Sequence, residues 1–245
     1  MKARFALGRT SPPRTSAVPR QPFIQFYKQG MQYAVGPGQL ANRPELAALV
    51  AQCVSMWTDT ELQIALSLGA ILKTNSEAAV ALFLAIKTSR TQRDALSSVA
   101  RLLLKGDDLD TFDALLMAYA SLEKQRNALA RGLFGTSDAL PDCLLWSDLQ
   151  DHANFLINVY AREYQGIQVA DPHEKLRNDM AVYRRSDLQE LLNNLTELQR
   201  AAFCFHCHHQ PRPQKTDQYL REMLELPVIK IGLAAIKQKR ESRDV

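Results

Sequence analysis

Cysteine is scarce in this sequence, which holds only four in 245 residues, at positions 53, 143, 204 and 207. So few and so scattered cysteines argue against a disulfide scaffold and favour a reducing compartment. Long apolar runs are lacking as well, since no stretch approaches the roughly eighteen residues that a membrane-spanning helix needs. The N-terminus has basic residues but no apolar stretch of about seven, which argues against a secretory signal. We therefore expect a cytoplasmic protein that has no membrane partner.

An excess of one charge sign is also missing from most of the chain. The formal net charge is +4, but residues 1–22 hold five basic residues and no acidic one, so that 25 basic residues face 26 acidic residues in the remainder. Net charge therefore does not predict a broad nucleic-acid-binding face, although a local basic patch stays open. The sequence contains no phosphate-binding glycine loop, no His-Glu-x-x-His motif and no nucleophile elbow. It consequently predicts no cofactor.

Composition divides the chain into three parts. Residues 1–22 combine four prolines with the basic residues and have too few apolar side chains to offset the entropy of ordering, so we expect a disordered tail. The alternative is a basic arm that touches nucleic acid or anionic lipid. Since 46% of the chain is hydrophobic, it has enough apolar residues to bury a sizeable core. We assign residues 23–210 to a helical bundle domain and residues 211–245 to a C-terminal helical extension.

Helical periodicity dominates residues 45–132. Apolar residues recur three and four apart from 45 to 73, and Pro44 suits the first turn of that helix. Two shorter helices are expected over 75–87 and 91–105. A fourth runs to Gly132, where the glycine would supply a left-handed cap. Four successive antiparallel helices with short links predict a bundle.

The pattern changes beyond Gly132. The stretch "LPDCLLW" is typical of an extended segment and "MAVYRR" of a short strand, which together allow a minor β-hairpin. Residues 148–164 are predicted to be helical, residues 165–175 to be a loop, and residues 187–206 to be helical again. A last helix over about 216–225 and the segment 228–240 complete a fold that we class as all-α.

One arginine stands on the apolar side of the fourth helix. Arg126 follows Tyr119 by seven residues and Phe112 by fourteen, which places it within about 40° of both on a helical wheel. Asn127 lies eleven residues after Leu116 and also falls near the apolar face. A guanidinium is expensive to bury alone, so we expect this face to meet an acid, backbone carbonyls, water or another chain.

The segment "SLEKQRNALARGLFG" resembles the signature helix of the HEPN superfamily, small helical bundles in which an Arg and a polar residue, commonly Asn, precede a His by four to six positions. It is also similar to bacterial members that follow the pattern acid-x-x-Arg-Asn-x-x-Ala-His-Gly-x-aromatic-Gly. The matching positions hold Glu123, Arg126, Asn127, Ala130, Gly132, Phe134 and Gly135. The resemblance covers residues 45–146 best. It implies a HEPN-like bundle that forms a homodimer through this helix.

The position of the family's histidine holds Arg131 in this chain. In active members, two chains pair along the helix, and two Arg and two His form a composite site that cleaves RNA. Metal-free cleavage needs a group that gives and takes a proton near neutral pH, which imidazole does and guanidinium, with a pKa above about 12, does not. Arg131 can therefore hold a phosphate but cannot act as the base.

The leading hypothesis is a non-catalytic, dimeric HEPN-like module with a binding or regulatory role. Its candidate ligand-binding residues are Glu123, Arg126, Asn127 and Arg131, and its partner is an RNA or nucleotide phosphate or another protein. The alternative is a metal-independent endoribonuclease in which Arg126 and Asn127 act with His152. A third hypothesis is purely structural, with Arg126 paired to an acid of a neighbouring helix.

Metal-binding residue types gather in "FCFHCHHQ", where Cys204, Cys207, His206 and His208 are candidate zinc ligands. Structural zinc sites normally draw a second ligand pair from a separate segment, and the sequence has no second close Cys/His pair. If the helix continues through Cys207, both cysteines share one face and act as small core residues. We favour this interpretation over a metal site.

Overall fold

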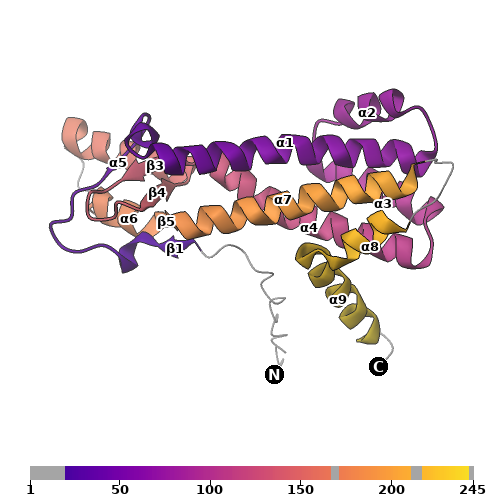
Figure 1. Ribbon diagram of the computed structural model, residues 1–245. Coiled ribbons are helices and arrows are strands. Elements are labelled where there is room, and N and C mark those ends of the chain that lie inside the picture. Colours follow the sequence, from indigo (N-terminus) through magenta and orange to yellow (C-terminus); the bar gives the residue numbers. More distant parts are fainter. Residues whose placement is uncertain (1–19, 167–170, 211–216, 243–245) are drawn as a thin grey trace, which may run out of the picture.

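The computed structural model describes residues 20–166, 171–210 and 217–242. Within these ranges the chain forms an elongated helical bundle with a small antiparallel sheet at one end (Figure 1). The expected helical fold with a minor β component is confirmed. No helix in these ranges combines the length and the apolar character that a membrane crossing requires.

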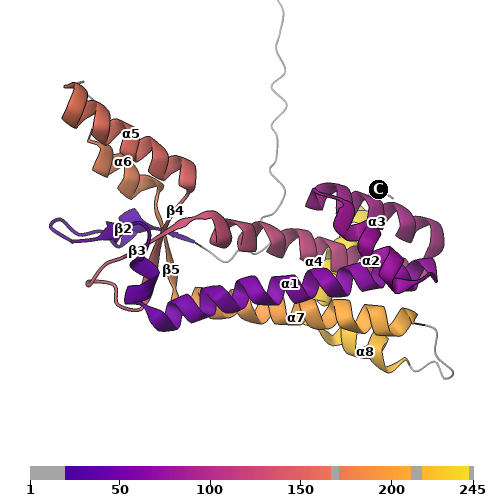
Figure 2. The ribbon, with the colours of Figure 1, turned by 90° about the horizontal axis from the view of Figure 1, so that it is seen from above.

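Two long helices form the axis of the bundle. Helix α1 (Pro44–Leu72) and helix α7 (Arg185–His209) lie side by side along most of their length, and α4 (Gly106–Arg131) packs against both. The shorter helices α2 (Ser76–Ala85) and α3 (Ser89–Leu103) lie at the end of the bundle away from the sheet (Figure 2). Pro44 occupies the first turn of α1, as predicted.

The last two helices join the same core. Helix α8 (Gln218–Glu225) packs on α7, and α9 (Pro227–Glu241) packs on α4. Their side chains Met223 and Ile229 are fully buried among the core residues of α1, α4 and α7. The described part of the segment 211–245 therefore shares the hydrophobic core of the bundle.

The sheet contains more strands than the expected hairpin. Its strands are β1 (Gln21–Pro22), β2 (Ala34–Val35), β3 (Leu133–Thr136), β4 (Cys143–Ser147) and β5 (Ala181–Arg184), with two short 3₁₀ helices, η1 (Phe23–Gln25) and η2 (Gln39–Asn42). The spatial order is β1-β5-β4-β3-β2, and neighbouring strands are antiparallel. In the hairpin of β3 and β4, Phe134 lies opposite Trp146.

Alternation along the strands connects the sheet to two cores. Successive side chains of a strand point to opposite faces. Leu144 and Trp146 therefore pack into the core of the bundle, whereas Leu145 and Val182 join Phe23 in a second, smaller core on the other face. Helices α5 (Leu149–Gln165) and α6 (Pro172–Asp179) project from this end of the molecule, away from the bundle (Figure 2).

Helix α6 corrects the prediction of a loop over residues 165–175. The carboxylate of Asp171 accepts a hydrogen bond of 3.0 Å from the backbone N–H of His173, and Pro172 occupies the first helical turn. An acidic N-cap followed by proline is a strong helix start, which the sequence pattern "ADPHEK" contains. Helix α5 agrees with the prediction.

The prediction of a disordered tail over 1–22 is wrong at its C-terminal end. Gln21 and Pro22 pair with β5, and the guanidinium of Arg20 lies 4.3 Å from the centre of the Trp146 ring. Residues 1–19 lie outside the described residues.

Gly132 ends α4 for a different reason from the predicted one. Its φ of −81° and ψ of 160° are extended rather than left-handed. A Cβ atom at this position would collide with the indole nitrogen of Trp146, which donates a hydrogen bond of 3.1 Å to the carbonyl of Ala128. The glycine is thus required by the close approach of β4 to the end of α4.

Candidate functional site

Arg126 lies at the seam between α4 and α1. Its Nη2 atom is 3.8 Å from Oε2 of Glu61, and its Cζ atom is 4.9 Å from the centre of the Trp57 ring. Trp57 in turn stacks on Tyr119 with 4.6 Å between the ring centres. The side chain of Arg126 is 22% exposed. The predicted position near the apolar face is confirmed, and the seam in which it lies joins two helices of one chain.

The polar groups of this seam are incompletely satisfied. The distance to Glu61 is longer than a hydrogen bond, the Nε atom of Arg126 is buried without a hydrogen-bond partner, and so is Nε1 of Trp57. Burial lowers the pKa of Arg126, the nearby Glu61 and Tyr119 oppose this change, and the charge of Arg131 adds to it. The guanidinium is therefore held by charge and by the indole ring more than by hydrogen bonds.

Glu123, three residues before Arg126 on α4, is paired with a different residue. Its side chain is buried, and its carboxylate pairs with the guanidinium of Arg93 on α3. The pair links α3 to α4. Glu123 is thus already engaged by a basic residue of its own chain, and it does not neutralise Arg126.

Three other residues of the last two turns of α4 are accessible. Lys124 and Arg131 are exposed, and Asn127 is half-buried. Lys124 and Arg131 are seven residues apart, so they lie within about 20° of each other on the helix. Neither forms an ion pair within the described residues, and the amide of Asn127 makes no hydrogen bond there. This end of α4 therefore presents basic groups that lack an internal acid.

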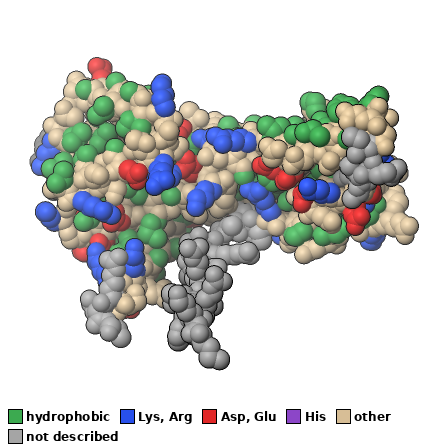
Figure 3. All heavy atoms as spheres, turned by 180° about the vertical axis from the view of Figure 1, so that it is seen from behind, with side chains coloured by type: hydrophobic (Ala, Val, Ile, Leu, Met, Phe, Trp, Pro, Cys, Tyr) green, Lys and Arg blue, Asp and Glu red, His purple; other side chains and the backbone are tan. Residues whose placement is uncertain are grey.

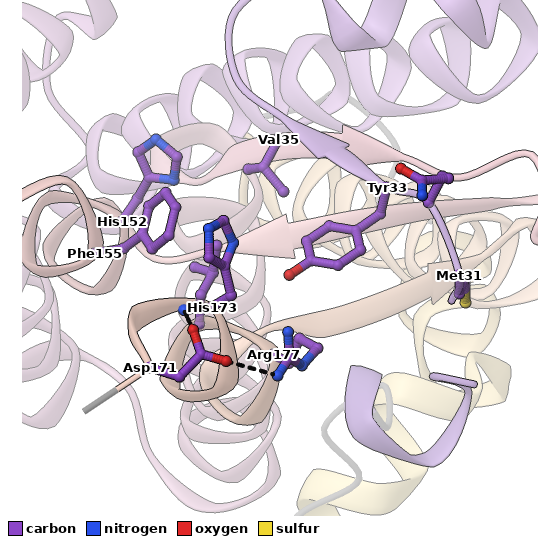
Figure 4. A pocket seen from close by; sticks show the side chains of 10 residues that line it. Met31, Tyr33, Val35, His152, Phe155, Asp171, His173 and Arg177 are labelled. Atoms are coloured by element: carbon purple, nitrogen blue, oxygen red, sulfur yellow. Dashed lines mark hydrogen bonds and ion pairs between the residues drawn. The ribbon is translucent and has the colours of Figure 1, made fainter. Parts of the chain in front are cut away.

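The structure places His152 in a separate pocket. The cavity of about 510 Å³ lies between β2, α5 and α6 and is lined by Met31, Gln32, Tyr33, Val35, His152, Phe155, Asp171, His173, Leu176 and Arg177 (Figure 4). No hydrogen bond, ion pair or ring contact links His152 to Arg126 within the described residues. Burial lowers the pKa of His152, and its Nδ1 atom is buried without a hydrogen-bond partner.

This pocket combines one ion pair with aromatic rings. Arg177 lies 3.4 Å from the carboxylate of Asp171 and 4.9 Å from the centre of the Tyr27 ring. The Tyr33 ring points into the pocket toward His173 and Arg177 (Figure 4), and burial raises its pKa. Because Asp171 compensates the charge of Arg177, the pocket is suited to a neutral polar molecule rather than to a strongly charged one.

The cysteines and histidines of α7 point to different environments. The four cysteines of the chain are free thiols. Cys204 and Cys207 are buried, and burial raises the pKa of Cys204 to about 11. The structure confirms that both cysteines are core residues. His208 and His209, in the last turn of α7, lie beside Asp108 of α4 instead, a group that the sequence pattern did not reveal.

Sequence reasoning missed several residues that surround the predicted ones. Glu61 and Trp57 belong to another helix, and their contact with Arg126 depends on how α1 and α4 cross. Glu61 interrupts the apolar pattern of residues 61–73, and this interruption was the one signal that could have indicated a partly buried ion pair. The residues of the pocket in Figure 4 come from three segments without a shared motif.

Comparisons with known proteins found no relative of this chain. No protein-family model matches the chain, and neither a curated protein nor a solved structure does.

Proposed function

We propose that this chain is a non-catalytic, HEPN-like binding or regulatory module that contacts the phosphate groups of RNA or of a nucleotide. Arg126, Asn127 and Arg131 make the contact in this proposal. The resemblance of residues 121–135 to the HEPN signature helix supports it, and a helical bundle is the architecture which that resemblance implies.

The charge balance at the end of α4 carries the proposal. Lys124, Arg126 and Arg131 lie within two turns, and Glu61, at 3.8 Å from Arg126, is the single acid that pairs with any of them within the described residues. Burial lowers the pKa of Arg126, and the charge of Arg131 adds a smaller contribution in the same direction. A phosphate at this end of α4 would supply the negative charge that Lys124 and Arg131 lack and would accept hydrogen bonds from a guanidinium.

The contact is local rather than spread over a broad face. On the face shown in Figure 3, basic and acidic side chains are interspersed. A few phosphate contacts give weak binding that depends on salt. Weak binding of this kind suits a regulatory contact, or a dimer in which each of two chains supplies one site.

The positions of three histidines support a non-catalytic role in this proposal. Arg131 occupies the position of the family's proton-transfer residue, and His152 and His173 line the pocket of Figure 4. His208 lies beside Asp108 at the start of α4, which is eighteen residues, or about 27 Å along the helix axis, from Arg126. His152, His173 and His208 are therefore each engaged in a part of the structure other than the seam of Arg126, which favours a binding role over proton transfer.

Dimerisation along α4 belongs to the same proposal. Met117, Lys124 and Arg131 recur at intervals of seven residues, and all three are exposed. A second α4 packed on this stripe would bring two copies of Lys124 and Arg131 together, while Arg126 of each chain stays at the seam with its own α1. The molar mass in solution, measured by light scattering, tests this part.

Fluorescence anisotropy with a labelled single-stranded oligoribonucleotide tests the proposed function. We expect Arg131→Ala to weaken binding about three- to fivefold, as suits an exposed ionic contact. Replacement of Arg126 by Gln should weaken it about tenfold or more, because hydrogen bonds to charged groups contribute about 1.5–3 kcal/mol. Lys87→Ala, in the link between α2 and α3, removes the same charge elsewhere and is the matched control.

Three outcomes contradict the proposal. The first is equal binding by the wild type and the Arg131→Ala and Arg126→Gln variants, all shown to be folded by circular dichroism. The second is binding to a protein partner that depends on these residues while RNA and nucleotides do not bind. The third is RNA cleavage in the presence of a chelator that both Arg126→Gln and His152→Ala abolish, which would establish the ribonuclease alternative with His152 supplied by a second chain.

A further inference from the structure

We propose that Asp108, His208 and His209 bind a divalent transition-metal ion of the zinc class where the first turn of α4 meets the last turn of α7. The inference is independent of the proposed phosphate contact at the other end of α4. It also differs from the zinc ligands expected from the sequence, because it excludes both cysteines and includes an aspartate that is a hundred residues away from His208.

The ligand atoms of the three residues already lie close together. One ligand atom from each residue can be chosen so that all three are within 4.8 Å of one another. Within the group, Nε2 of His208 is 3.8 Å from Oδ1 of Asp108. Around an ion with bonds of about 2.0–2.1 Å, tetrahedral ligand atoms are about 3.4 Å apart. Small side-chain rotations would therefore bring all three atoms onto one ion.

The donor set indicates the kind of metal. Two imidazoles and one carboxylate suit zinc and neighbouring transition metals, whereas magnesium and calcium prefer oxygen ligands throughout. Three protein ligands leave the fourth position of a tetrahedral ion to water. The side chain of Asp108 is 41% exposed, which leaves solvent access on that side.

The surroundings restrict the two imidazoles. Side chains of adjacent helical residues normally point about 100° apart, so two neighbouring histidines seldom reach one ion. Here both rings are turned to the same region at the helix end, with 4.9 Å between their centres. The His209 ring packs on Phe205 at 4.4 Å, and the side chain of His208 is 10% exposed. Packing therefore holds the rings near the geometry that an ion needs.

A bound ion would join two segments that are distant in sequence. Asp108 belongs to the start of α4, and the histidines end α7 just before the link to α8. An ion that binds the folded chain and not the unfolded chain stabilises the folded state by mass action. We expect the ion to stabilise the contact between the start of α4 and the end of α7.

Cobalt titration of chelator-treated, full-length protein without a polyhistidine tag tests the proposal. Co²⁺ gives visible absorption bands that intensify in a tetrahedral site, and Zn²⁺ should displace it and raise the unfolding temperature. We expect His208→Gln and Asp108→Asn to weaken Co²⁺ binding by at least about tenfold. Mutation of residues that only hydrogen-bond to a metal ligand already lowers metal affinity about ten- to a hundredfold, and loss of a ligand itself should cost no less. Asp107→Asn, an exposed neighbour on the same turn, is the matched control and should bind as the wild type does.

Several results would overturn the proposal. Wild-type protein that shows neither a tetrahedral Co²⁺ spectrum nor a Zn²⁺-dependent unfolding temperature has no such site. Unchanged affinity in both His208→Gln and Asp108→Asn, each verified as folded by circular dichroism, places the ion elsewhere. Loss of binding in Cys204→Ser with unchanged binding in His208→Gln would assign the metal to the cysteines.

Discussion

Arg126 holds its guanidinium 4.9 Å from the centre of the Trp57 ring, across the seam between α4 and α1. The ring is itself stacked on Tyr119, so a cation and two aromatic rings form a continuous contact between the helices. Cation–π contacts contribute about 0.5–1 kcal/mol when partly exposed. The contact positions Arg126 without using a hydrogen bond; its Nε atom is buried, and the side chain as a whole is 22% exposed, so an anion can reach the guanidinium only from its exposed side.

Two of the acids that pair with arginines in the bundle, Glu123 and Glu61, should differ in importance. Glu123 is buried and pairs closely with the partly exposed Arg93, whereas Glu61 is itself partly exposed and 3.8 Å from Arg126. Removing one partner of a buried pair leaves an uncompensated charge, so we expect Glu123→Gln to lower the free energy of unfolding by about 2 kcal/mol or more. Glu61→Gln should cost less than about 1 kcal/mol. Urea unfolding of both variants checks this, and equal costs would contradict it.

Gly132 should be intolerant of any side chain as long as Trp146 is present. We expect Gly132→Ala to lower the free energy of unfolding by about 1–3 kcal/mol, because a Cβ atom collides with the indole and displaces its hydrogen bond to Ala128. In a Trp146→Leu background, the same change should cost much less. A double-mutant cycle measured by chemical denaturation tests the coupling. Identical costs in both backgrounds would show that the collision is not the cause.

Alkaline pH should destabilise the protein through its buried thiols. Burial raises the pKa of Cys53 to about 12 and that of Cys204 to about 11, from an ordinary value of 9.0. Above pH 9 the unfolded chain loses these protons while the folded chain keeps them, so stability is fully present below pH 9 and falls toward pH 11. The slope is at most about 1.4 kcal/mol per pH unit for each thiol.

The double variant Cys53→Ala, Cys204→Ala provides the comparison for this slope. Its free energy of unfolding should fall less steeply between pH 9 and pH 11 than that of the wild type. Burial also raises the pKa of Tyr119, which adds a contribution of the same sign to both proteins. An equal slope in the two proteins would exclude the thiols as the source.

The dependence of RNA affinity on salt concentration should show whether Arg131 contacts a phosphate. Each phosphate contact with a single strand contributes about 0.7 to the slope of log affinity against log salt concentration. We expect Arg131→Ala to reduce the magnitude of this slope by about that amount, while Lys87→Ala leaves it unchanged. Anisotropy titrations at several salt concentrations give both slopes. A slope that Arg131→Ala leaves intact would remove Arg131 from the phosphate contact.

The helices were predictable because their apolar residues repeat with the period of a helix. This local signal located α1, α4 and α5 and placed Arg126 on the apolar side of α4. The helix α6 was missed because the loop signals of Gly166 and Pro172 outweighed the cap that Asp171 supplies. Short polar helices have too few periodic residues to indicate themselves.

The partners of the candidate residues were not predictable in the same way. Glu61 reaches Arg126, and Asp108 reaches His208, only because α1, α4 and α7 pack at particular offsets. The position of Gly132 was identified from the sequence, but its role depends on Trp146, which comes from a strand fourteen residues later.

The sequence by itself indicated where the main helices run, that Arg126 lies near the apolar face of its helix, and that Cys204 and Cys207 share one face of theirs. These features depend on periodicity within one helix, which neighbouring residues specify. Tertiary structure alone decided the order of the sheet, the separation of His152 from Arg126, and the meeting of Asp108 with His208 and His209. Such contacts join distant segments, and their geometry depends on the simultaneous packing of several elements, which no local pattern contains.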